Sequence, residues 1–310
     1  RALARRLPRG LGALRLALGD HARESNVGRP AAEELASALP GSLRSFSLAL
    51  HNCPGVGDEG VGALLERLPG ELTALGFSAF NCGLGSGSVQ AFQRTLSRLP
   101  HLRALELTFL GIGVSADSLL AMLAQAVPPK LASLELGLLN FGGLSVGGAR
   151  ALAGALREGL GSLELHLPPA GDAALAVLAD ALPASFESLL LACTSRAFGA
   201  KGGGKRGRPA CSLAGAEALA QAVRRCGGLR SLDLSLSLGD LGVCLLVLPG
   251  SLRSFALRDA SVGDAGARHL ARRLPGSLQR CLLLLPRGVS REAQAELLAR
   301  PLTSAAEFVL

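Results

Sequence analysis

A short pattern of leucines, L-x-x-L-x-L, recurs along the whole chain. Its first, fourth and sixth positions are apolar in nearly every copy, as in Leu102, Leu105 and Leu107, and in most copies the eighth is apolar too. Apolar and polar positions that alternate with a period of two predict a short strand with one buried face. The copies begin at Leu11, Leu43, Leu72, Leu102, Leu131, Leu160, Phe186, Leu229, Leu252 and Leu278.

A helical pattern follows most strands after a turn rich in glycine and serine. Leucine and alanine recur with the spacing of one helix face in segments such as 31–40, 61–69, 118–128 and 216–225. Most of these segments end at proline or glycine, which stop helices, just before the next strand. One strand and one helix cannot bury their apolar faces alone, so the copies must stack on one another.

Two segments show the complete unit most clearly. Residues 257–278 read LRDASVGDAGARHLARRLPGSL, and residues 57–72 read GDEGVGALLERLPGEL. They resemble the ribonuclease-inhibitor class of leucine-rich repeats, in which the leucine motif precedes a G-D-x-G-A type turn and a helix. The resemblance covers practically all 310 residues. It implies an α/β solenoid of about ten repeats in a single array over 1–310, with a parallel sheet on the concave face and helices on the convex face.

One position departs from that class of repeat, which often carries asparagine or cysteine at its ninth position to bond the backbone between layers. Here the ninth positions are His51, Phe80, Leu110, Leu139 and Ala260. Polar residues come one position later, at Asp20, Asn52, Asn81 and Asn140. We therefore expect a longer strand with a shifted turn, which places the usual asparagine ladder in question.

The ends and the cysteines bear on location. Residues 1–11 are rich in arginine, as transit peptides are, but they match residues 268–278 at eight of eleven positions, which favours another copy of the repeat over a transit peptide. Neither end carries an obvious polar cap, and we expect a segment of a longer protein. The seven cysteines show no C-x-x-C spacing, which fits a reducing compartment, cytoplasmic or nuclear. No apolar run is long enough to span a bilayer.

The formal net charge of +8 would favour an acidic partner such as nucleic acid. Many arginines, however, lie where helices are predicted to end, as in TLSRLP and AVRRCGG, where a cation opposes the negative end of the helix dipole. Arginine, glycine, alanine, proline and leucine are also the residues that GC-rich codons specify. Nucleic-acid binding is therefore the least favoured function.

Enzyme-like motifs have simpler interpretations. Gly143, Ser145 and Gly147 form G-x-S-x-G, but Ser86 and Ser115 occupy nearly the same place in other repeats, which predicts a helix cap. Residues 199–205 match a P-loop except that Arg206 replaces the hydroxyl that holds magnesium. The five histidines lie in different repeats without a zinc-binding motif. We expect no catalytic, cofactor or metal site.

An insertion in the seventh repeat, residues 194–211, lengthens its spacing and is rich in glycine. It carries five basic residues and no acidic one: Arg196, Lys201, Lys205, Arg206 and Arg208. A solvated loop is the favoured interpretation, and a nuclear-import signal or a contact to acidic partners remain alternatives.

The fifth position of each repeat points away from the core, into the concave face. It is glutamate in three successive copies, at Glu106, Glu135 and Glu164. Like charges on adjacent strands destabilise a sheet, so either neighbours such as Arg103 and His166 offset them, or a solvated face tolerates them, or the stripe serves a cationic partner. We predict partner binding by Glu106, Glu135, Glu164, His166 and Asp233.

These features favour a non-catalytic protein–protein interaction scaffold or recognition module that uses the concave strand face. The resemblance also implies an alternative, a GTPase-activating or receptor-type regulatory role, because proteins with such roles carry similar repeats. The predicted partner is one or more proteins with a basic surface.

Overall fold

The computed structural model describes residues 7–20, 22–193, 212–259, 261–284, 286 and 288–299, together with the backbone of 307–309. Strands and helices alternate, and the chain divides into two compact units, Arg1–Gly142 (unit 1) and Gly143–Leu310 (unit 2). Unit 1 contains β1 (Ala13–Gly19), α1 (Arg29–Ala38), β2 (Ser45–His51), α2 (Gly57–Glu66), β3 (Ala74–Phe80), α3 (Ser86–Ser97), β4 (Ala104–Leu110), α4 (Ala116–Ala126) and β5 (Ser133–Leu139). Unit 2 contains α5 (Val146–Ala155), β6 (Ser162–Leu167), α6 (Asp172–Ala181), β7 (Ser188–Cys193), α7 (Leu213–Arg225), β8 (Ser231–Ser235), α8 (Gly239–Leu245), β9 (Ser254–Arg258), α9 (Asp264–Arg273), β10 (Arg280–Leu284), α10 (Arg291–Leu298) and β11 (Glu307–Val309).

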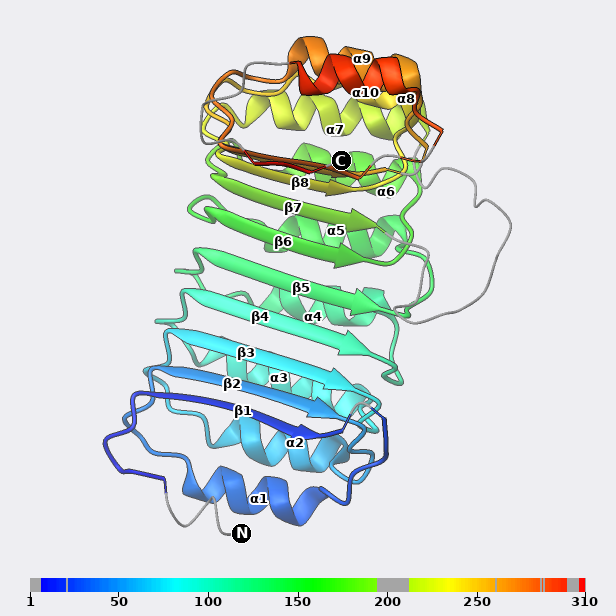
Figure 1. Cartoon of the computed structure of the whole chain (residues 1–310). Coiled ribbons are helices and arrows are strands. Elements are labelled where there is room, and N and C mark those ends of the chain that lie inside the picture. The colour runs from blue at the N-terminus through cyan, green and yellow to red at the C-terminus, as the bar shows by residue number, and fades with distance from the viewer. Residues whose placement is uncertain are drawn as a thin grey trace. The chain divides into compact units, whose positions relative to one another are not determined.

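Each unit has one parallel sheet whose strands follow chain order, β1 to β5 in unit 1 and β6 to β11 in unit 2. Helices cover one face of each sheet (Figure 1), and we call the other face the open face. The leucine motifs are in register, so that Leu48 pairs with Phe77 and Leu107 pairs with Leu136. The predicted alternation of strand and helix and the parallel stacking of the motifs are confirmed.

The core lies between each sheet and its helices. On β4, burial alternates residue by residue, and Leu105, Leu107 and Phe109 are buried. Phe77 and Phe92 pack edge to face with ring centroids 5.0 Å apart, and Phe92 and Phe109 do so at 5.6 Å. Burial of each such side chain contributes about 1.5–3 kcal/mol. Every repeat thus adds one layer of apolar side chains to its neighbours.

The helices begin two to four residues earlier than the apolar pattern predicts. Helix α2 begins at Gly57 and α7 at Leu213, whereas the pattern begins at residues 61 and 216. The early turn contains the Gly-Asp of the G-D-x-G-A type turn in α2. These polar residues belong to the helix because they make contacts with the next repeat.

Aspartates at the helix amino ends form those contacts. Asp58 in α2 accepts hydrogen bonds from the backbone N–H groups of Gly85, Gly87 and Ser88 at the start of α3. Burial raises the pKa of Asp58, but bonds from the Ser88 hydroxyl and from these N–H groups outweigh it and leave the pKa lowered. Asp172, Asp240 and Asp264 contact the start of the next helix in the same way. Each carboxylate therefore caps a helix in the following repeat.

Arginines cap the carboxyl ends of helices in the preceding repeat. The Arg98 guanidinium, just after α3, donates to the Leu65 carbonyl in α2 at 2.6 Å. Arg225, at the end of α7, donates to the Ala179 carbonyl in α6 at 2.7 Å. Both carbonyls lie in the last turn of a helix, where intrahelical donors are absent. These bonds support the structural interpretation of the arginines, although the helix served is the neighbouring one.

The strands of unit 1 have seven residues, so the expected longer strand is confirmed there. The asparagine ladder is present, one residue later than usual. Asn52 and Asn81 adopt left-handed backbone angles, with φ of 49° and 50°, which asparagine tolerates better than most residues. The Asn81 amide donates to Asn52 Oδ1 at 3.0 Å, and the Asn52 amide donates to the Asp20 carbonyl at 2.8 Å. The shifted turn preserves the bonds between layers.

Candidate functional site

The open face of unit 1 carries a pair of adjacent glutamates. Glu106 on β4 and Glu135 on β5 are in register, on parallel strands about 4.8 Å apart. Gly76 is the register partner of Glu106 on β3, and a Cβ there would lie 2.9 Å from Ser47 Oγ and 3.3 Å from Glu106 Oε2. The absence of a side chain at Gly76 therefore leaves room for the Glu106 carboxylate.

Two further rows of side chains run beside this acidic row. The middle row consists of small residues, Ala49, Ser78, Thr108 and Gly137. The next row, at the carboxyl ends of the strands, contains the half-buried apolar residues Phe80, Leu110 and Leu139. Unit 1 therefore presents carboxylates and an apolar ridge on one face, separated by small side chains.

In unit 2, the predicted residues Glu164 and His166 lie together on β6. His166 Nε2 is 2.9 Å from Glu164 Oε1, and both side chains are more than a third exposed. Their register neighbours on β7 are Leu190 and Ala192. His166 therefore lies within hydrogen-bond distance of Glu164, as the alternative in which neighbours offset the glutamates requires.

Asp233, the remaining predicted residue of the strand face, is engaged by a cation. Arg258 Nη1 on β9 donates to Asp233 Oδ1 on β8, and the Asp233 side chain is only 19% exposed. Its charge is therefore largely compensated within the sheet.

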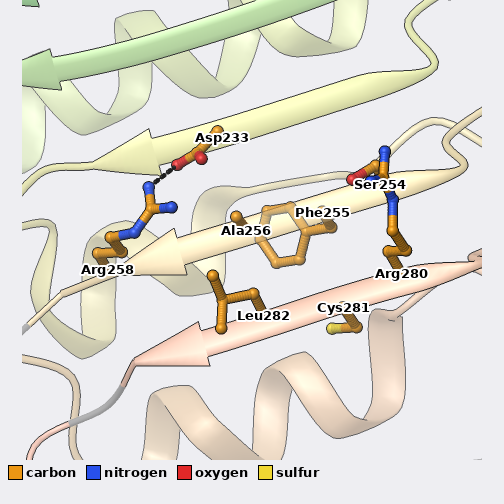
Figure 2. Close-up of a pocket in the computed structure, with 8 residues that line it drawn as sticks. All are labelled: Asp233, Ser254, Phe255, Ala256, Arg258, Arg280, Cys281 and Leu282. Carbon is orange, nitrogen blue, oxygen red and sulfur yellow. Dashed lines mark hydrogen bonds and ion pairs between the residues drawn. The ribbon is translucent and has the colours of Figure 1, made fainter. Parts of the chain in front are cut away.

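A hollow of about 350 Å³ opens on the open face of unit 2, over β8, β9 and β10 (Figure 2). Asp233 and Arg258 lie at one end, Ser254 and Arg280 at the other, and Ala256 and Leu282 between them. Cys281 also lines the hollow, and burial raises the pKa of its thiol to about 12, which keeps the thiol protonated and a poor nucleophile.

Sequence reasoning missed Ser254, Arg258 and Arg280 because, apart from His166, it followed the fifth position of each repeat. Alternate residues of a strand share a face, so the third and seventh positions also belong to the open face. The signal was present: Arg258 and Arg280 are both arginines at such positions. Their convergence on one hollow required the register of β9 and β10.

The enzyme-like motifs lead to no assembled site in the part of the chain that the structure describes. Ser145 caps α5, since its hydroxyl accepts from the Gly148 N–H at 3.0 Å, and Ser115 caps α4, so the predicted capping role is confirmed for both. Ser86 differs: α3 has Gly85 as its N-cap, and Asp58 takes the capping role. Within the described ranges, no three His, Cys, Asp or Glu residues gather as metal ligands.

The basic insertion 194–211, with Arg196, Lys201, Lys205, Arg206 and Arg208, and the P-loop-like stretch within it lie outside the described residues. None of the helices in the described ranges combines the length and the apolar character that crossing a membrane requires.

Comparison with solved structures supports the fold. A chain of the yeast Rad7–Elc1 complex matches 95% of this chain and 68% of its own length, with 15% identity and a TM-score of 0.55. The leucine-rich-repeat protein LegL7 from Legionella pneumophila matches 94% and 92%, with 16% identity and a TM-score of 0.45. No protein-family model and no curated protein sequence matches the chain. The stacked leucine motifs, with strand and helix alternating, form the fold of a leucine-rich-repeat solenoid, and the chain from the Rad7–Elc1 complex has a similar fold.

Proposed function

We propose that this protein is a non-catalytic recognition module whose open sheet face binds a protein partner with a basic surface. The observation that carries the proposal is the register pair Glu106 and Glu135 on adjacent strands of unit 1. Two carboxylates on adjacent strands of one face make an acidic surface, whose charge is complementary to that of a basic partner. Glu164, with His166, adds a third carboxylate on the open face of unit 2.

The surroundings of the acidic pair support contact with a protein. The half-buried ridge of Phe80, Leu110 and Leu139 lies two positions farther along each strand from the small row, and protein interfaces combine apolar contact with polar groups. The yeast chain of similar fold comes from a complex of two proteins, which is a precedent for partner binding on this scaffold.

The test compares affinity purifications made with three purified chains. These are the wild type, a variant with Glu106→Arg, Glu135→Arg and Glu164→Arg, and a control with Glu217→Arg on the exposed surface of α7. We expect basic proteins to be retained by the wild type and the control and lost from the triple variant, as measured by quantitative mass spectrometry of the eluates.

Thermal unfolding of the same chains separates recognition from folding. Because the substitutions lie on the open face, we expect Glu135→Arg alone to weaken partner binding without lowering the unfolding temperature. Retention of the same proteins by all three chains would show that the acidic row is a tolerated solvated surface, and would end the proposal.

A further inference from the structure

We propose that the hollow on unit 2 is a second recognition site that takes an acidic segment of a partner protein. Carboxylates of that segment bind Arg258 and Arg280, and an apolar side chain packs over Ala256 and Leu282. The inference rests on the proposed function in treating the open face as the recognition surface, but it assigns this part of the face the opposite charge preference.

The charges that line the hollow favour an anion. Two arginines and one aspartate line it, and Asp233 accepts a hydrogen bond from only one guanidinium nitrogen of Arg258. A guanidinium has five N–H donors, so Arg258 keeps donors for a ligand while Asp233 fixes its orientation. Arg280 is exposed at the start of β10 and has no ion pair to any side chain that the structure describes. Arginine forks match carboxylates in two-point hydrogen bonds.

The spacing of the arginines fits an extended polypeptide. Arg280 is in register with Ser254, and Arg258 stands four residues farther along β9 than Ser254. At about 3.3 Å per residue, the two arginine positions are separated by about 13 Å along the strand direction. In an extended segment, side chains i and i+4 span that distance on one face, with i+2 midway. The midway side chain would lie over Ala256 and Leu282, so the pattern acidic–x–apolar–x–acidic matches the hollow.

The apolar surface of the hollow distinguishes a protein segment from a nucleic acid. Leu282 lines the hollow, and Leu284, which follows on the same face of β10, is 45% exposed. Asp233 would repel a phosphate backbone, which carries a charge at every nucleotide. A polypeptide can place its carboxylates on the arginines and keep uncharged residues near Asp233.

Fluorescence anisotropy with a labelled synthetic peptide, three copies of Glu-Ser-Leu-Ser followed by Glu, tests the inference on the whole chain. A peptide with glutamine in place of each glutamate is the matched probe. We expect the wild type to bind the acidic probe and not the glutamine probe. Arg280→Gln should weaken binding about tenfold or more, because it removes a charge-assisted bond. Arg224→Gln on α7, which removes the same charge outside the hollow, should leave binding unchanged.

A substitution that is expected to strengthen binding of the acidic probe provides a second test. Asp233→Asn should strengthen binding of the acidic probe, because Arg258 then loses its internal carboxylate. Glu307→Gln, which changes the register partner of Arg280 on β11, must not weaken binding. The inference is overturned if Arg280→Gln binds the acidic probe as the wild type does, if Arg224→Gln weakens it equally, or if a DNA oligonucleotide binds more tightly than the peptide and Arg280→Gln abolishes that binding.

Failure of this inference and failure of the proposed function can be told apart. The triple glutamate variant changes only the acidic positions, so it should retain the acidic probe even if it loses every basic partner. Failure of the acidic probe together with loss of basic partners from the triple variant would overturn this inference alone.

Discussion

The two units end their strands in different ways. In unit 1, Asn52 and Asn81 follow seven-residue strands and hydrogen-bond to each other from one repeat to the next. In unit 2, Asp259 follows the five-residue strand β9 and is 1% exposed. Its carboxylate accepts from the N–H groups of Leu238, Gly239 and Ser261. The turn after a strand is thus bonded to the neighbouring repeat by neutral amides in unit 1 and by a carboxylate in unit 2.

The difference shows which kind of side chain can link many repeats in a row. An amide has both a donor and an acceptor, so identical asparagines can bond in a row through successive layers. A carboxylate only accepts, so it cannot bond to a copy of itself; Asp259 instead collects donors from two successive turns, at Leu238 and Gly239 at the start of α8 and at Ser261 before α9. We therefore expect the turns held by Asp259 to depend strongly on one residue, and the turns of unit 1 to share their stabilisation among neighbours.

The largest expected effect follows from removal of Asp259. Asp259→Ala leaves three N–H groups and the Ser261 hydroxyl without their acceptor, in bonds that are buried at Leu238 and partly buried at Gly239 and Ser261. We expect a loss of about 3 kcal/mol or more in the free energy of unfolding, because unsatisfied buried donors are costly. Hydrogen exchange should rise from β8 to α9 before it rises in β1 to β5. Asp259→Asn, which keeps one acceptor, should lose less; equal losses would contradict the carboxylate's role.

A smaller effect is expected from Asn81. Asn81→Ala removes the hydrogen bond that the Asn81 amide donates to Asn52, and it places a residue with a Cβ but no polar group at a φ of 50°. The left-handed backbone and the lost bond together should cost about 2 kcal/mol, as measured by urea unfolding. Asn81→Gly removes the same bond without the backbone strain and should cost less. If alanine and glycine destabilise equally, the backbone conformation is not what asparagine provides there.

The smallest effect concerns the caps, which both units share. Asp58→Asn should cost about 1 kcal/mol at neutral pH, as the loss of a helix cap does. The pKa of Asp58 is lowered in the folded chain, so its contribution is present above the unfolded-state pKa of about 3.9 and is lost as the pH falls toward the folded value.

Urea unfolding of the two chains between pH 7 and pH 3 checks this pH dependence. The wild type should lose its advantage over Asp58→Asn as the pH falls. Asp180→Asn, at an exposed carboxylate on α6, is the matched control. Its free energy of unfolding should change with pH in parallel with that of the wild type. An advantage that stays constant down to pH 3 would contradict the lowered pKa.

Period and burial made the layers of the fold predictable. The apolar positions of Leu105 and Leu107 recur in nearly every copy because stacked layers need the same buried positions, and this signal is local. The start of α2 could not be predicted as well, since Asp58 belongs to the helix through bonds to residues about thirty positions later. The sequence placed the asparagine ladder in question because the asparagines come one position later than in the usual repeat. The seven-residue strand before them moves the turn by the same amount, so the bonds between layers still form.

The candidate site was predictable only in part, for the same reason. Glu106 and Glu135 share a repeat position, so their adjacency could be inferred from the spacing of the motif. Compensation of Asp233 by Arg258 joins different positions of two strands, and it depends on side-chain direction as well as register. Contacts between unlike positions of a repeat leave no periodic trace in the sequence.

Among the residues that the structure describes, most side-chain hydrogen-bond donors bond to acceptors that lie earlier in the sequence. Arg98 and Arg225 donate to the helix before their own, Ser277 donates to the Leu252 carbonyl, and Asn81 donates to Asn52. A repeat that leaves the ribosome therefore finds the acceptors for these donors already synthesised, and it can dock as soon as it emerges. The order of synthesis therefore supplies each acceptor before its donor. A circular permutant in which α2 is translated after Arg98 would reverse that order for this bond.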